Sequence, residues 1–394
     1  MLEAFIPMEL ILPKIVFGLG AVQTLAAHAN DVSEGEILII TDKGLMKSGI
    51  VDRLRDFLSS SRRVCSVFDG VESDPSIENV EQCLTEARAK KPGLIVGVGG
   101  GSSLDVVKVT AALAGERGSI RQYFGHGKIT KKGIPTILIP TTAGTGTEVA
   151  IGAVVSDHQE RLKKGILSPY LLCDVTILDP ELSVSCPGSV TAAAGLDALT
   201  HAIEVYTNRK ALKLVDPIVL AAVEMIGRNI RTAYKDGSNI AARSELLLAS
   251  MYAGIGMQAV NNAAVHALSA PLGAFYEVPH GAANSFLLPY VMKFNKFACI
   301  EKYSLIARAM GVKCSDDLEE NTALLVNEIK SLSRDLGIGT YLSGISIRKD
   351  DIPRMARLSL KVWLIANNPR EVTLDDAVSI YEEAFAEEGI PVVS

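Results

Sequence analysis

The chain has 394 residues, with 39 Lys and Arg against 45 Asp and Glu, so its formal net charge at pH 7 is −6. This mildly acidic balance argues against a nucleic-acid partner, because binding a phosphate backbone needs a dense basic face. Hydrophobic residues make up 48% of the chain, enough to bury a large core and to exclude disorder as the main state. At roughly 100–200 residues per domain, this length predicts two domains.

The first twenty residues do not have the pattern of a targeting segment. Glu3 and Glu9 stand where a secretory peptide carries Lys or Arg, and no small-residue cleavage site follows an apolar run. No stretch is apolar for long enough to predict a membrane span. The six cysteines are scattered without a Cys-x-x-Cys pair, which is typical of reduced thiols. We therefore expect a cytoplasmic protein with no membrane partner.

The first half of the chain alternates short β-branched runs with amphipathic stretches. The predicted strands are 36–41, 64–68, 93–98, 136–139 and 175–178. Helices are predicted between them at 77–90 and 102–114. This alternation is typical of βαβ units around a parallel sheet that is covered on both faces. A hairpin insertion is expected near residues 151–166.

After about Cys186 we expect no further strands, because helical periodicity takes over. The predicted helices are 190–207, 215–234, 241–257, 262–274 and 318–336. Gly and Pro mark the joins between them. The sequence therefore predicts an α/β domain with a parallel sheet over residues 1–185 and an all-α domain over residues 186–394. We expect a ligand in the cleft between the two domains.

A Gly-rich loop follows the predicted strand 93–98. In GVGGGSSLDVVK (97–108), three glycines precede a helix that is predicted to open at Ser102. The glycines, at 99, 100 and 101, allow close approach of the backbone to a phosphate, and the helix N-terminus offers unpaired N–H groups. A purely structural turn between strand and helix is an equally good interpretation, since Ser102 and Asp105 have the spacing of a capping box. Ser102 also stands where the last glycine of G-x-G-x-x-G would be.

A second loop, PTTAGTGTE (140–148), follows the strand 136–139 and sets threonine hydroxyls among glycines. Its threonines are Thr141, Thr142, Thr145 and Thr147. A flexible turn is the alternative. Two such loops at the carboxyl ends of strands in one sheet would converge on one ligand, which favours a dinucleotide or a nucleoside phosphate. The first domain is therefore predicted to bind a dinucleotide.

Asp42 follows the predicted strand 36–41. A carboxylate at a strand tip can accept hydrogen bonds from an adenosine ribose diol and would repel a 2′-phosphate. Asp42 thus favours NAD over NADP if the two loops hold a dinucleotide. The alternative is an ordinary turn aspartate.

One aspartate and three histidines lie in the apolar helical half. Asp197 and His201 are four residues apart, on one face of a predicted helix. His266 lies in NNAAVHALSAPLG, and His280 follows Pro279 in the first turn of another predicted helix. Burial requires that these groups be satisfied, either by separate hydrogen bonds or by joining around a divalent metal. Three imidazoles and one carboxylate suit Fe²⁺ or Zn²⁺ and also permit Ni²⁺ or Mn²⁺.

Over almost its whole length the chain resembles the iron-containing (group III) alcohol dehydrogenases. The matching segments are PKIVFGLGAV (13–22), TDKGL (41–45), GGGSSLDVVK (99–108), PTTAGTGTEV (140–149), GLDALTHAIEVY (195–206) and HALSAPLGAFYEVPHGAANSFLLPYV (266–291). The resemblance implies an N-terminal dinucleotide-binding α/β domain and an all-α C-terminal metal-binding domain. It implies catalytic metal ligands at Asp197, His201, His266 and His280. It implies cofactor contacts at Asp42, Gly100, Gly101, Ser102, Asp105, Thr141, Thr142, Thr145 and Lys163.

The chain departs from the family pattern at two places. Many members carry a second His four residues after the first ligand of the HALxH segment, where it is thought to relay a proton, and this chain has Ala270 there. Water or the ribose hydroxyls could carry the proton instead. The usual Pro-Asp before the last strand is Cys173-Asp174, for which we expect only a local effect.

The resemblance implies an NAD-dependent oxidoreductase that transfers hydride between NAD(H) and a small alcohol or aldehyde, with Fe²⁺ or Zn²⁺ as its metal. It also suggests a homodimer or a higher homo-oligomer. One alternative is a lyase or synthase similar to dehydroquinate synthase, which reduces NAD transiently. Against it, the helical half lacks the Lys/Arg clustering that a phosphorylated substrate would need. The other alternative is a non-catalytic nucleotide-binding protein with structural histidines.

Overall fold

The computed structural model describes residues 9–160 and 162–393, so Glu3 lies outside the described residues. Its N-terminal half is built on a six-stranded sheet in the order β1-β9-β6-β4-β2-β3, and all the strands are parallel. The strands are β1 (Lys14–Phe17), β2 (Ile37–Ile40), β3 (Cys65–Phe68), β4 (Leu94–Gly99), β6 (Thr136–Pro140) and β9 (Val175–Leu178). The predicted parallel sheet is confirmed.

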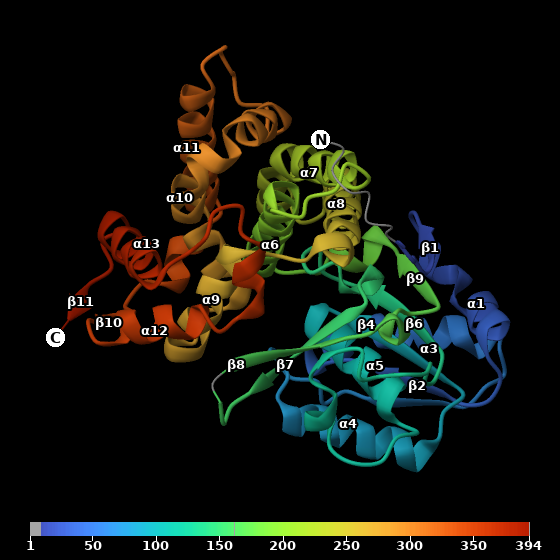
Figure 1. Cartoon of the computed structure of the whole chain (residues 1–394). Coiled ribbons are helices and arrows are strands. Elements are labelled where there is room, and N and C mark those ends of the chain that lie inside the picture. The colour runs from blue at the N-terminus through green and yellow to red at the C-terminus, as the bar shows by residue number, and fades with distance from the viewer. Residues whose placement is uncertain (1–8, 161, 394) are drawn as a thin grey trace.

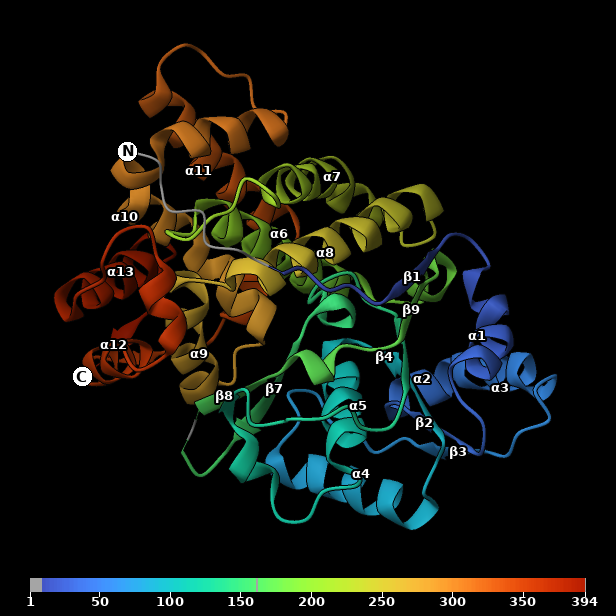
Figure 2. The same ribbon diagram turned by 45° about the vertical axis from the view of Figure 1, so that its right-hand side comes forward.

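Helices cover both faces of this sheet (Figures 1 and 2). They are α1 (Leu25–Val32), α2 (Lys43–Ser48), α3 (Ile50–Ser59), α4 (Ile77–Lys90) and α5 (Gly101–Leu113). Successive side chains of a strand point to opposite faces. Leu38 and Ile40 of β2 therefore join a cluster with α4 and α5, whereas Ile37 and Ile39 join a cluster with α1 and α3. This two-sided burial explains why the inner strands are continuous apolar runs.

The predicted hairpin is also confirmed. Strands β7 (Gly152–Asp157) and β8 (Leu162–Leu167) pair antiparallel, and β5 (Gly125–His126) adds a third strand beside β8. The hairpin leaves the α/β half and reaches α9 (Ala264–Tyr276) of the helical half, as Figure 2 shows. It therefore forms part of the wall between the two halves.

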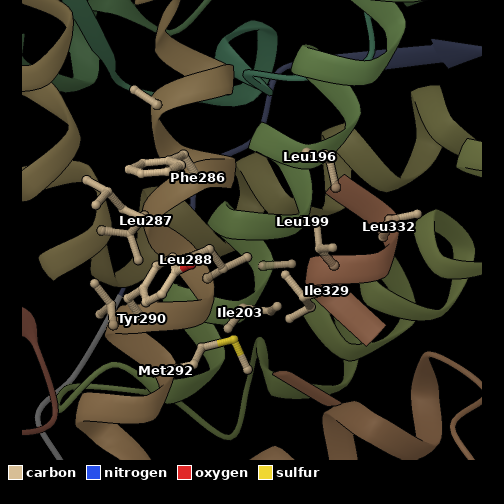
Figure 3. Close-up of a cluster of buried hydrophobic side chains, with 14 of the residues drawn as sticks. Leu196, Leu199, Ile203, Phe286, Leu287, Leu288, Tyr290, Met292, Ile329 and Leu332 are labelled. Carbon is tan, nitrogen blue, oxygen red and sulfur yellow. The ribbon is translucent and has the colours of Figure 1, made fainter. Parts of the chain in front are cut away.

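The helical half surrounds one long buried helix, α6 (Gly188–Thr207), which packs against its neighbours α7, α8 and α10. The other helices are α7 (Asp216–Lys235), α8 (Ile240–Val260), α9, α10 (His280–Ala309), α11 (Leu318–Asp335), α12 (Asp351–Ser359) and α13 (Leu374–Glu387). In Figure 3, Leu199 and Ile203 of α6 lie in a cluster with residues of α10 and α11. The Ala-rich sequence of α6 allows this close packing on several sides.

Some expectations were incomplete or wrong. Strand β1 and helices α1–α3, α10, α12 and α13 were not predicted, except that His280 does begin a helix as expected. The expectation of no strand after about Cys186 is wrong, because β10 (Ile347–Arg348) and β11 (Val392–Val393) form a parallel pair. Each of these strands has only two residues, which is too short to leave a periodic signal.

The division between the halves at residue 185 stays a prediction. Strand β9 ends at Leu178 and α6 begins at Gly188, which agrees with it. One hydrophobic cluster nevertheless contains residues from both halves, since Leu178 of β9 and Leu247 of α8 both belong to it. None of the described helices is both long and apolar enough to cross a membrane.

Candidate functional site

The two Gly-rich loops meet at the carboxyl edge of the sheet, because β4 and β6 are neighbours there. The Thr141 N–H donates to the Gly99 carbonyl oxygen at 3.0 Å. A Cβ added to Gly101 would lie 2.4 Å from Thr145 Cγ2, so only glycine fits against this threonine without a shift. The predicted convergence of the loops is therefore present in the structure.

A cavity of about 610 Å³ lies between the two halves, beside these loops. The predicted site residues that line it are Gly101, Ser102, Asp105, Thr145, Lys163, Asp197, His201, His266 and His280. Ala270, one turn after His266 on α9, also lines it. In the described part of the chain, the lining does not include Asp42, Gly100, Thr141 or Thr142. The structure thus brings most of the predicted residues to one place.

Asp42 has a structural contact of its own. Its Oδ1 accepts hydrogen bonds from the N–H groups of Gly44 at 2.7 Å and Leu45 at 3.1 Å, so it caps the N-terminus of α2. This is the role expected of an ordinary turn aspartate. This capping role occupies Oδ1 of Asp42. The contact between Asp42 and a ribose stays a prediction.

The capping box suggested for Ser102 and Asp105 is wrong. Helix α5 begins one residue earlier, at Gly101, so Ser102 is inside the first turn and the helix has no side-chain cap. Ser102 Oγ instead accepts from the Asp74 N–H at 3.2 Å. Asp105 accepts from Thr147 Oγ1 at 2.5 Å and from the Val154 N–H at 2.9 Å. Asp105 therefore ties α5 to the threonine loop and to the hairpin.

Lys163 from β8 forms an ion pair across the cavity wall with Asp74, at 2.5 Å between Nζ and Oδ1. Burial opposes ionisation of Asp74, but the Lys163 ammonium outweighs it and lowers the pKa of this carboxyl. Asp74 was not singled out from the sequence. Its φ of 52° lies in the left-handed region, which is uncommon for a residue other than glycine, and no sequence pattern signals it.

Three helices supply the Asp/His cluster. Asp197 and His201 lie one turn apart on α6, His266 lies in the first turn of α9, and His280 begins α10. From Asp197 Oδ1 the Nε2 atoms of His201 and His266 are 3.7 Å away, and that of His280 is 3.9 Å away. Asp197, His201 and His266 form the tightest group, with ligand atoms all within 4.8 Å of one another.

The protonation states of this cluster follow from burial and charge. Burial opposes ionisation of Asp197, but the three nearby imidazoles and the amide of Asn284 outweigh it and lower its pKa to about 2. Burial lowers the pKa of His201, and burial with the charge of Lys163 lowers that of His280 to about 3. At neutral pH the cluster therefore combines a carboxylate at Asp197 with neutral imidazoles at His201 and His280, the forms that bind metal ions.

Two further residues contact the cluster. Asn284 Nδ2 lies 2.7 Å from Asp197 Oδ1, 3.0 Å from His266 Nε2 and 3.2 Å from His280 Nε2. Glu204 Oε2 lies 2.6 Å from His266 Nδ1. Neither residue was identified from the sequence. For Glu204 a signal exists, since residues 197, 201 and 204 share the i, i+4, i+7 face of α6.

The cluster fits a divalent cation. Ligands about 2.1 Å from a tetrahedral cation lie about 3.4 Å apart, close to the separations found around Asp197. The Asn284 Nδ2 atom lies within 3.2 Å of three of the four acceptors, so these acceptors surround one small region of space. The Gly144 carbonyl, 3.3 Å from His201 Nδ1, favours the tautomer with a free Nε2 lone pair.

Comparison with known proteins gives consistent matches. Residues 13–180 match the family model described as iron-containing alcohol dehydrogenase, and residues 191–385 match the C-terminal model of the Fe-containing alcohol dehydrogenase family. Lactaldehyde reductase from Escherichia coli K12 is 36% identical over 372 residues, which covers 94% of this chain and 97% of that protein.

Solved structures agree with these matches. The crystal structure of a 1,3-propanediol oxidoreductase superposes with a TM-score of 0.91 at 34% identity, covering 96% of this chain and 100% of that one. Sulfoacetaldehyde reductase from Bifidobacterium kashiwanohense, solved in complex with NAD⁺, superposes with a TM-score of 0.84 at 28% identity, covering 96% and 99%.

Proposed function

The chain belongs to the iron-containing alcohol dehydrogenase family, and from this premise we propose what its site does. It is an enzyme, an oxidoreductase that transfers hydride between NAD(H) and a small alcohol or aldehyde. The family disfavours the lyase alternative and the non-catalytic alternative. The roles of the individual residues remain to be assigned.

We propose that Asp197, His201, His266 and His280 hold the metal, with Fe²⁺ as the first choice and Zn²⁺ as the alternative. The observation that carries this assignment is the buried cluster around Asp197, built from three helices with its carboxylate ionised. A metal bound there would act as a Lewis acid that lowers the pKa of an alcohol or polarises a carbonyl group.

The α/β half would bind NAD at the carboxyl edge of the sheet. The uncapped first turn of α5 offers N–H groups to a phosphate, and Gly101 and Thr145 allow its close approach. The proposed cofactor contacts are Asp42, Gly100, Gly101, Ser102, Asp105, Thr141, Thr142, Thr145 and Lys163. The NAD⁺ complex of the Bifidobacterium reductase supports the choice of cofactor. The nicotinamide would then share the cavity with the substrate.

The proton path is the point at which this chain departs from its family. Ala270 lines the cavity one turn after His266, and its methyl group has no proton that it can transfer. We propose that water in the cavity or a ribose hydroxyl moves the proton to and from the substrate oxygen. The relatives named above act on lactaldehyde, sulfoacetaldehyde and 1,3-propanediol, so we propose a short aldehyde or alcohol as substrate. We also propose a cytoplasmic homodimer or higher homo-oligomer.

The test is NADH oxidation with a panel of short aldehydes, on protein stripped of metal and reloaded with Fe²⁺ or Zn²⁺ without oxygen. We expect turnover only after reloading, and we expect the better metal to be identified in the same experiment. His266→Ala and His280→Ala should lose both metal and turnover. If both variants kept metal and full turnover, the assignment of these ligands would be wrong.

A further inference from the structure

Glu204 is a buried carboxylate whose contacts all lie on one neighbouring helix. It stands on α6, seven residues after Asp197, and its side chain is 5% exposed. Its Oε1 accepts from the Val265 N–H at 2.6 Å. Its Oε2 accepts from the Ala263 N–H at 3.1 Å and lies 2.6 Å from His266 Nδ1. Among the described residues, Glu204 has no ion pair with Lys or Arg.

These contacts decide where the proton of His266 lies. Both oxygens of Glu204 accept backbone N–H groups, so Oε2 also presents an acceptor to the Nδ1 atom of His266. An acceptor 2.6 Å from Nδ1 requires a proton on Nδ1, and Nε2 then presents its lone pair to the Asn284 amide 3.0 Å away. That Nε2 lies 3.7 Å from Asp197 Oδ1, on the cavity side of the ring.

The same carboxylate also fixes the position of the helix that carries His266. Helix α9 begins at Ala264, and its N-cap residue, Ala263, has no side chain able to cap it. Glu204 supplies the cap from α6, across a gap of about sixty residues in sequence. One side chain thus holds the α9 N-terminus and the His266 ring against the helix that carries Asp197 and His201.

We infer that Glu204 is a positioning residue, which orients His266 and sets its tautomer so that Nε2 can bind a metal ion. This inference rests on the proposed function, because it assumes that the cluster holds a metal. Glutamine is nearly isosteric with glutamate but presents an NH₂ group. In Glu204→Gln that group faces either the Val265 N–H, which breaks the cap of α9, or His266 Nδ1, which it can meet only if the proton moves to Nε2 and blocks the lone pair.

The first measurement needs no substitution. We would record ¹⁵N-detected histidine spectra of the full-length wild-type chain after metal removal, using its six histidines and a His266→Gln variant for assignment. We expect the Nδ1–H tautomer at His266. The Nε2–H tautomer there would overturn the inference.

The second measurement is the affinity for Zn²⁺, by competition with a chelator, in wild type and in Glu204→Gln. Loss of an outer carboxylate typically costs 10–100-fold in metal affinity, and we expect a loss in this range. Unchanged affinity in the variant would refute the role of Glu204. No Zn²⁺ or Fe²⁺ binding by the wild type would refute the proposed function instead.

Asp179→Asn is the matched control. Asp179 is also a fully buried carboxylate that accepts backbone N–H groups, from Val22 at 3.1 Å and from Glu181 at 3.1 Å. None of its described contacts is a histidine. We expect Asp179→Asn to lose stability while keeping the affinity for Zn²⁺ and the tautomer of His266. An equal loss of affinity in the control would mean that Glu204 acts only through stability.

Discussion

At the scale of the residue, burial decides what the ionisable groups of this enzyme can do. Lys108, which is almost fully buried, donates to the carbonyl oxygens of Thr147 and Ala150 at 2.9 and 3.1 Å, and burial lowers its pKa. Asp197 keeps its charge because imidazoles and an amide surround it. The neighbours of a buried ionisable group thus decide whether its role is structural, as for Lys108, or chemical, as for Asp197.

Asp42→Gly tests the choice between NAD and NADP. Removing the carboxylate removes the repulsion of a 2′-phosphate, so we expect the preference for NAD over NADP to fall by about tenfold or more. Glycine replaces aspartate at an N-cap at a cost of only a few tenths of a kcal/mol, so α2 should persist. The ratio of kcat/KM for the two cofactors measures the effect. Asp317→Gly, at the N-cap of α11, is the control, and an unchanged preference in Asp42→Gly would refute this role.

Glu148→Gln tests a buried acid near the charged groups of Lys108 and Asp105. Burial raises the pKa of Glu148 from an ordinary 4.5 to about 7, against the pull of Lys108. The folded state therefore holds the proton more tightly than the unfolded state. Between these two pKa values, the free energy of unfolding should fall as pH rises, by on the order of 3 kcal/mol. In Glu148→Gln this dependence of the free energy of unfolding on pH should be absent.

Urea unfolding at about pH 4.5 and about pH 8 would measure the slope in both proteins. Glu371→Gln is the control, because Glu371 is exposed and should leave the slope as it is. If the free energy of unfolding changed equally with pH in wild type and in Glu148→Gln, the proton would be bound by a group other than Glu148.

At the scale of the element, the site depends on how closely helices approach one another. A Cβ added to Gly281, at the start of α10, would lie 2.3 Å from the Ala193 carbonyl oxygen of α6. Backbone cannot move aside as a flexible side chain can. The absence of a side chain at this position therefore allows His280 to lie near Asp197.

Gly281→Ala should push α10 away from α6. We expect a loss of about 1–3 kcal/mol in the free energy of unfolding, as in other overpacked contacts, and weaker binding of Zn²⁺. Urea unfolding and chelator competition measure the two effects. Gly115→Ala is the control, since nothing lies within 4 Å of an added Cβ there. Full metal affinity in Gly281→Ala would show that the helix contact does not set the ligand spacing.

At the scale of the whole molecule, the two halves meet over the cavity. His126 of β5 and Trp363 of η7 (Trp363–Asn367) touch across it edge to face, with ring centroids 5.2 Å apart. Both residues line the cavity, and Trp363 is the only tryptophan of the chain. A ligand that enters the cavity between the halves should therefore change the surroundings of Trp363.

Binding of NAD⁺ should change the fluorescence emission of Trp363, because a ligand in the cavity alters the solvation of this ring. A titration of emission against NAD⁺, compared with calorimetric binding, makes the measurement. Trp363→Phe should abolish the signal and so identify its source. An emission that stays constant while calorimetry shows saturation would place the cofactor away from this part of the cavity.

Much of the layout of the enzyme could be predicted from the sequence. Five of the six sheet strands, the hairpin, the two loops and the Asp/His set were all predicted, because each depends on local periodicity or on residue types close together in sequence. Strand β1 was not predicted, because it is a four-residue edge strand with no fully buried position. Of helix α10 only the first turn, at His280, was predicted.

The contacts between these parts depend on tertiary packing and could not be predicted. It showed that Asp105 binds Thr147 and Val154 instead of capping its own helix, since the start of α5 depends on the loop packed against it. It also brought Glu204 to His266, a contact between α6 and α9. Such contacts join residues that no local period relates, so burial and packing of whole helices select them.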